Sequence, residues 1–161
     1  MIKVFTKSLS INSLFPTRVL SVQVLYAFTI CRKIKSINTI KKDLIKFHKT
    51  NFINVKINHE IFNFIIDTTV KNYIYLDNII STVLTNSWRM DKIPIVILSI
   101  FRANCCECIF SNNRNHALSI CEYLQIAKSL NYQDNIKFIH AVIDNIAKHS
   151  ENYKVFKNSF M

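Results

Sequence analysis

The sequence contains no glycine and only two prolines, Pro16 and Pro94. Glycine supplies the positive φ angles that tight β-hairpin turns need, so its absence disfavours folds built from hairpins. Asparagine enters the left-handed backbone region at a lower cost than most residues do. We therefore expect asparagines to end helices at residues 111–113 and at Asn131.

Acidic residues are absent from residues 1–42, which carry eight lysines and arginines. The whole chain has 21 Lys and Arg against 10 Asp and Glu, a formal net charge of +11. Such an excess attracts polyanions and says nothing about the fold. We expect a basic N-terminal arm over residues 1–15. A mitochondrial transit peptide has a similar composition and stays open as an alternative.

Long apolar runs are also missing. The longest run, residues 93–101, contains Pro94 and is only nine residues long. A run of this length is too short to cross a bilayer. Lys7 and the polar residues after it interrupt any secretory h-region. We therefore expect a cytoplasmic protein that makes no membrane contact.

The five cysteines are odd in number and lack a secretory context, which indicates reduced thiols. Cys105, Cys106 and Cys108 lie close together, with His116 nearby. Zinc needs four ligands, whereas a lone C-x-x-C spacing has no second pair here. Small buried thiols are the better interpretation, and we expect neither a metal nor a cofactor.

Apolar residues recur at three- and four-residue spacings through most of the chain, which indicates amphipathic helices. Residues 93–108 are apolar nearly all round, as expected of a central helix. We predict an all-α fold with a compact bundle of about six to seven helices, a domain over 16–150 and a C-terminal tail over 151–161. The expected helices cover residues 16–30, 37–50, 57–86 (as two helices or one bent helix), 93–108, 116–130 and 135–149.

Several sequence blocks occur in a fixed order along the chain. They read Arg18-x-x-Ser21-Val22-Gln23-Val24-Leu25-Tyr26, Asn72-x-x-Tyr75-Leu76-Asp77, Arg102-Ala103-x-x-x-Glu107, Ile120-x-Glu122-Tyr123-x-x-Ile126-Ala127-Lys128-Ser129-Leu130 and Asp134-x-x-Lys137-Phe138-Ile139-x-x-Val142-Ile143-Asp144. In order and spacing these blocks resemble the signature of the NusB family of transcription antitermination proteins. The resemblance covers about residues 16–149.

The chain departs from the family pattern at a few positions. Cys121 stands where the family has Asn, and His140-Ala141 replaces Asn-Gly. The arginine cluster before the first helix is reduced to isolated cations, and Ile97-Leu98 replaces an acidic-basic pair. The first two changes concern local packing. The last two bear on the contacts with RNA and with a partner protein.

The resemblance implies a helical bundle of two packed subbundles that catalyses no reaction. By the same resemblance it would bind boxA RNA together with NusE, a small-subunit ribosomal protein, and support rRNA transcription in an elongation complex with other Nus factors. A monomer and a homodimer both stay open. The residues agree with a binding role, since no phosphate-binding loop, elbow serine or carboxylate pair in a cleft pattern is present.

The candidate RNA contacts combine cations with an aromatic ring, because single-stranded RNA is held through its phosphates and by stacking of its bases. Basic residues near the N-terminus are the candidates for phosphates, and the family's D-x-x-K-F block supplies the candidates for bases. In order these are Lys3, Lys7 and Arg18, then Asp134, Lys137 and Phe138. Solvated charge is the alternative for the cations, and core packing is the alternative for Phe138.

Tyr26 would face the partner protein by family resemblance, with a core position as its alternative. Asp91 is a second, weaker candidate for a basic partner. Arg102 and Glu107 lie in an apolar helix, so we expect each to pair with an opposite charge and to anchor neighbouring helices. A different role on the same fold also stays open, that of a detached RNA-binding domain related to the N-terminal part of rRNA cytosine methyltransferases.

Overall fold

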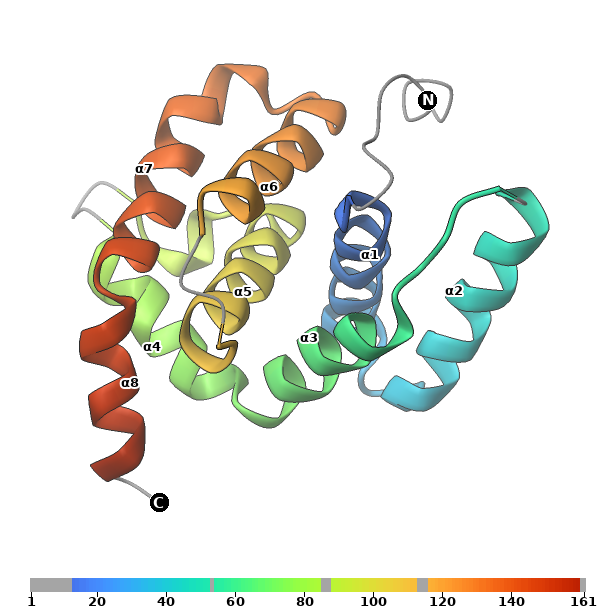
Figure 1. The fold of residues 1–161 in the computed structure, drawn as a ribbon, viewed down its shortest axis with the longest axis horizontal. Coiled ribbons are helices and arrows are strands. Elements are labelled where there is room, and N and C mark those ends of the chain that lie inside the picture. Colours follow the sequence, from blue (N-terminus) through green and yellow to red (C-terminus); the bar gives the residue numbers. More distant parts are fainter. Residues whose placement is uncertain (1–12, 53, 85–87, 113–115, 160–161) are drawn as a thin grey trace.

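The computed structural model describes residues 13–52, 54–84, 88–112 and 116–159. Within these ranges the chain is helical and contains no strand, which confirms the predicted all-α class (Figure 1). The elements are α1 (Phe15–Cys31), α2 (Ile37–Asn51), α3 (His59–Lys71), α4 (Tyr73–Val83), the short 3-10 turn η2 (Met90–Lys92), α5 (Ile95–Phe110), α6 (Ala117–Ser129), the 3-10 turn η3 (Gln133–Asn135), α7 (Ile136–Lys148) and α8 (Ser150–Ser159).

Polar side chains begin and end several of these helices. The Ser36 hydroxyl accepts a hydrogen bond from the Thr39 N–H at 3.2 Å, and the Asn58 side chain accepts one from the Ile61 N–H at 3.0 Å. Both contacts satisfy backbone donors that a helix start leaves unpaired. Asn131 follows α6 with a φ of 63°, which confirms that asparagine takes the role glycine usually has at a helix end.

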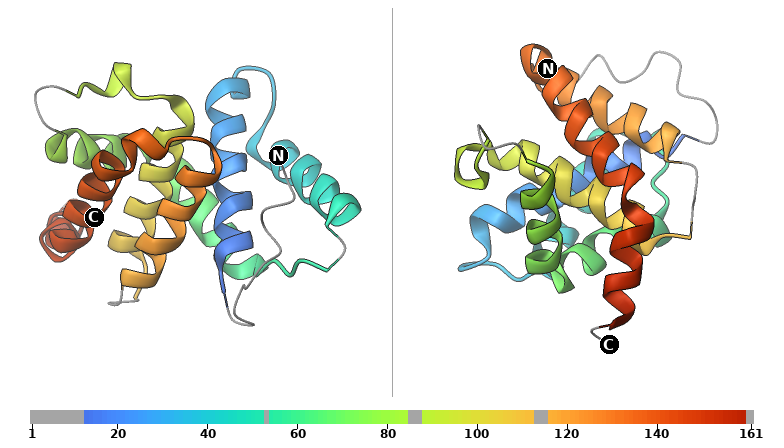
Figure 2. Two further views of the ribbon diagram at one scale, coloured as in Figure 1. Left: turned by 90° about the horizontal axis from the view of Figure 1, so that it is seen from above. Right: turned by 90° about the vertical axis from the view of Figure 1, so that its left-hand side faces the viewer.

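Helix α5 is the centre of the molecule, as its apolar sequence predicts. It packs against α1, α3, α4, α6, α7 and α8, and twelve of its side chains are buried. Cys105, Cys106 and Cys108 are among them, so these thiols are part of the core. The views in Figure 2 show the other helices arranged around this helix.

The core has two parts that share α1 and α3. The smaller one joins α1, α2 and α3 through Leu20, Val24, Ile40, Phe62 and Ile66. The larger one surrounds α5 and includes residues of all the other helices except α2. This division agrees with two packed subbundles. It leaves α2 at one side of the molecule and α7 and α8 at the other (Figure 1).

Two details differ from the sequence-based expectations or complete them. The segment 57–86 contains two helices that meet at Asn72, so the alternative of one bent helix is wrong. Helix α8 begins at Ser150 and occupies most of the expected tail, and the Tyr75 hydroxyl donates a hydrogen bond to its Tyr153 carbonyl at 2.7 Å. The described helices therefore number eight rather than six or seven. None of them is long and apolar enough to cross a membrane.

Candidate nucleic-acid and protein interface

A buried ionic cluster joins α1, α5 and α6 around Arg18. The guanidinium donates to both carboxylate oxygens of Glu107, at 2.9 and 2.6 Å, and to Glu122 Oε2 at 2.5 Å. The Tyr123 hydroxyl donates to Glu107 at 2.6 Å, and the Ser13 hydroxyl donates to Glu122 at 2.8 Å. We call these five residues the Arg18 cluster. It fixes the first helix against the helices that carry two of the signature blocks.

Burial alone would lower the pKa of the Arg18 guanidinium, but the hydrogen bonds and negative charge of Glu107 raise it by more. The pKa of the Tyr123 hydroxyl rises well above its usual value, first because the ring is buried and then because Glu107 is close. Arg18 therefore stays charged and Tyr123 stays neutral. Arg18 balances one negative charge of the two carboxylates, and the Tyr123 hydroxyl satisfies an oxygen of Glu107 with a hydrogen bond.

The position of Arg18 argues against the phosphate contact expected from the sequence. Its side chain is only 3% exposed, and its donors already bind two carboxylates. The expected pairing of Glu107 is confirmed by the same contacts. Arg102 is also paired, since both of its bonds to Asp77 measure 2.7 Å, and it donates to Thr29 at 3.2 Å.

An apolar groove opens between α1, the start of α5 and the end of α6. Its volume is about 740 Å³, and its walls carry few polar groups. Tyr26 and Ile95 are each 41% exposed at its surface. Tyr26 is therefore not a core tyrosine. The groove is lined by Val19, Val22, Gln23, Tyr26, Pro94, Ile95, Val96, Ile126, Ser129, Leu130 and Tyr132.

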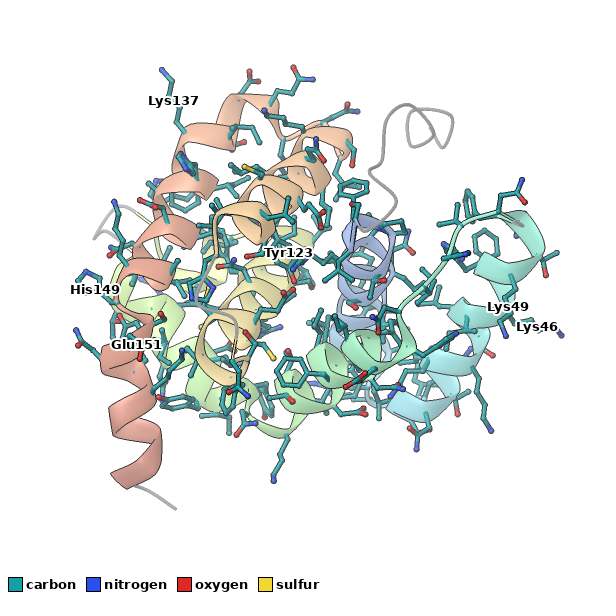
Figure 3. The ribbon with its side chains drawn as sticks, viewed as in Figure 1. Lys46, Lys49, Tyr123, Lys137, His149 and Glu151 are labelled. Carbon is teal, nitrogen blue, oxygen red and sulfur yellow. The ribbon has the colours of Figure 1, made fainter. Side chains whose placement is uncertain are left out.

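The turn η3 and the first turn of α7 follow directly after this groove in the chain. Asp134 lies two residues beyond the groove residue Tyr132 and is exposed. Lys137 is also exposed, and Figure 3 shows its side chain pointing away from the helices. A cation and a carboxylate thus stand in solvent within five residues of Tyr132 in the chain.

Phe138 is half-buried, and the sequence did not reveal its main contact. Its ring stacks on Trp88 with the centroids 4.2 Å apart and the planes 19° from parallel. Its ring also packs in a T-shaped arrangement with the core ring of Phe101, with the centroids 6.1 Å apart and the planes at 71°. Phe138 thus belongs both to the core margin and to an aromatic pair that is partly open to solvent.

Trp88 and Arg89 are additions to the site that the sequence analysis missed. Arg89 is exposed and holds Asp91 through bonds of 3.0 and 3.3 Å, so the acid expected to meet a basic partner already has a cation beside it. The available signal was the one tryptophan of the chain, followed by an arginine. Lys3 and Lys7 lie outside the described residues.

Comparison with known proteins identifies the family. The family model for NusB matches residues 16–148. The chain belongs to the NusB family. Relatives of this family include the transcription antitermination protein NusB of Rickettsia typhi, which is 28% identical over 151 residues, covering 90% of this chain and 96% of the relative. The NusB of Rickettsia conorii is 28% identical over 146 residues, covering 86% and 93%.

Solved NusB structures share the fold of this chain. One is a crystal structure of the antitermination factors NusB and NusE in complex with double-stranded RNA, with a TM-score of 0.70, 20% identity and coverage of 83% of this chain and 95% of the other. A crystal form of T. maritima NusB gives a TM-score of 0.71 at 20% identity, covering 85% and 92%. The helical arrangement of this chain is therefore that of NusB.

The cysteines of this NusB family member differ in their surroundings. Burial raises the pKa of Cys105 well above its usual value and raises the pKa values of Cys106 and Cys108 to about 12. These three thiols stay protonated at neutral pH. Cys121 on α6 is exposed and Cys31 is half-buried. The part of the chain that the structure describes contains no group of three or more side chains placed to hold a metal ion.

Proposed function

We propose that this chain is a transcription antitermination factor that binds boxA RNA and NusE on adjoining surfaces and so supports rRNA transcription. The observation that carries the proposal is an apolar groove whose lining ends at Tyr132, just before the exposed, charged first turn of α7 in the chain. Family membership supplies the antitermination role. The proposal requires binding and no covalent step, in the bacterial cytoplasm and together with other Nus factors.

The two surfaces differ in the ligands that suit them. The groove offers apolar walls and the exposed ring of Tyr26, which suit the apolar side chains of a protein partner. The start of α7 offers Lys137 for phosphates, Asp134 as a hydrogen-bond acceptor and the Trp88–Phe138 pair for base stacking. We assign the groove to NusE and the start of α7 to RNA.

The N-terminal arm fits the same arrangement. Ser13 binds Glu122 on α6, so the chain enters the bundle next to the helix that forms one wall of the groove. Lys3 and Lys7 precede Ser13 by ten and six residues in the sequence. We propose that they add phosphate contacts to the RNA held at α7.

The test uses Trp88 as an intrinsic probe, because it is the one tryptophan in the chain. We expect boxA RNA to change its fluorescence and to bind more tightly when NusE is present. Scrambled single-stranded RNA and a boxA duplex serve as comparison ligands. Equal affinity for boxA and scrambled RNA in the presence of NusE would contradict the proposal, as would binding that is insensitive to salt.

The detached methyltransferase-related domain is less well supported as a role. The first relatives match over 93% or more of their own length and carry the antitermination name.

A further inference from the structure

Helix α2 carries a second cationic surface, remote from the start of α7. Residues 32–56 contain eight lysines and arginines and one acid, Asp43. Two of the lysines are neutralised, since Lys35 binds Asp43 at 2.9 Å and Lys41 binds Asp67 at 2.8 Å. The remaining cations of α2 therefore dominate the charge of its outer side.

Lys42, Lys46 and Lys49 form a stripe along this side of the helix. Their spacing of four and three residues places them on one face. All three are exposed, and none has an acidic partner among the described side chains. The stripe is about 10 Å long, because a helix rises ~1.5 Å per residue. Figure 3 shows Lys46 and Lys49 pointing outward on the opposite side of the molecule from Lys137.

A small pocket begins where the stripe ends. Its volume is about 150 Å³, and Lys49 lines it together with His48 and Phe52. The rings of His48 and Phe52 lie 5.0 Å apart at 39°. Burial lowers the pKa of His48, so its ring is neutral near pH 7. The other lining residues are Leu20, Ile45, Val55, Ile57 and His59.

We propose that the lysine stripe and this pocket form a second binding surface for single-stranded RNA, in which the lysines contact phosphates and one base enters the pocket. The combination of a cationic track with an adjoining aromatic surface is the one that sequence-tolerant single-strand binding requires. An acidic protein could bind the lysines, but its binding would not require the aromatic pocket. The surface depends neither on boxA nor on NusE, so it goes beyond the proposed function.

The test compares two triple variants of the full-length protein that lose the same charge. K42Q/K46Q/K49Q removes the stripe. K71Q/K148Q/K154Q removes three cations from the ends of α3 and α7 and from α8, where only exposed or half-exposed ion pairs are lost. Binding of a fluorescein-labelled oligouridine is measured by anisotropy over a series of salt concentrations. Each single-strand phosphate contact contributes ~0.7 to the slope of log K against log salt.

We expect the stripe variant to lower the slope by about 2 and the control variant to leave it nearly unchanged. F52L, which keeps apolar bulk but removes the ring, should weaken oligouridine binding about tenfold, as expected for the loss of one stacked base. A strand containing 4-thiouridine should crosslink to residues 48–52. The proposal is overturned if both triple variants lose the same slope, or if no crosslink maps to α2 or its end.

The two RNA surfaces can be told apart by Trp88. The stripe variant should retain the full fluorescence change of Trp88 with boxA RNA, because α2 lies on the opposite side of the molecule from α7, whose Phe138 stacks on Trp88 (Figure 1). If boxA RNA does not change the fluorescence of Trp88 but the stripe binds oligouridine, the proposed RNA site at α7 is wrong and the second surface is supported. If the boxA response is normal and the stripe variant binds oligouridine as the wild type does, only the second surface is wrong.

Discussion

The guanidinium of Arg18 faces two carboxylates in a place that water hardly reaches. Removing one side of such a cluster leaves uncompensated buried charge, which costs about 3–5 kcal/mol. We therefore expect Arg18→Met to lower the free energy of unfolding by that amount in urea titrations. Arg18→Lys keeps the charge but loses the forked geometry, so it should cost less. A loss below about 1 kcal/mol for Arg18→Met would show that the cluster is not a structural anchor.

The role of Arg18 also marks where prediction from sequence stops. An exposed phosphate contact and a buried ion pair look alike in sequence, since both appear as an arginine near a helix start. The deciding partners, Glu107 and Glu122, lie 89 and 104 residues away. Nothing local indicates which carboxylate an arginine will meet. The sequence did not reveal the stacking of Trp88 on Phe138 for the same reason, because these two residues are 50 positions apart.

At the level of elements, three helices build the groove and none of them forms it alone. Tyr26 is 41% exposed, so Tyr26→Ala should lower the free energy of unfolding less than the loss of a fully buried tyrosine would. If the groove receives NusE, the same change should weaken NusE binding by roughly 30-fold, as for an aromatic hot spot worth about 2 kcal/mol. Tyr73→Ala is a matched control, because that ring is 38% exposed on α4. Equal effects of the two changes on NusE affinity would refute the assignment.

Helices themselves were largely predictable, since their signal is local. The apolar spacing within 93–108 and 135–149 is enough to place α5 and α7. Helix α8 was not predicted because its sequence is mostly polar. Its position depends on contacts with other helices, such as the hydrogen bond from Tyr75 to Tyr153. The break at Asn72 was left open, since no proline or glycine marks it.

At the scale of the whole molecule, the buried thiols lower the free energy of unfolding at high pH. The pKa values of Cys106 and Cys108 are about 12 in the folded chain against an ordinary value of 9.0, so folding favours their protonated forms. This stabilisation is complete below about pH 9 and is lost as pH rises toward 12. We expect the free energy of unfolding to fall over that window by about 1.4 kcal/mol per pH unit for each thiol.

Urea titrations between pH 8 and pH 11 measure this slope. The double variant Cys106→Ala/Cys108→Ala removes two of the three buried thiols and should make the slope less steep, although its stability at pH 8 will be lower because smaller side chains leave cavities. A slope that is unchanged in the double variant would assign the loss to other groups. Cys105 and Tyr123, whose pKa values are also raised, are the first alternatives.

The long sequence separations inside the Arg18 cluster have a consequence for how the protein is made. During synthesis α1 leaves the ribosome well before Glu107 and Glu122 have been added to the chain. Arg18 therefore has neither carboxylate partner of the cluster and stays in solvent until α5 and α6 have emerged. The groove needs the same late helix for one of its walls. If the groove receives NusE, a nascent chain therefore offers no complete docking place until α6 and Tyr132 have emerged from the ribosome.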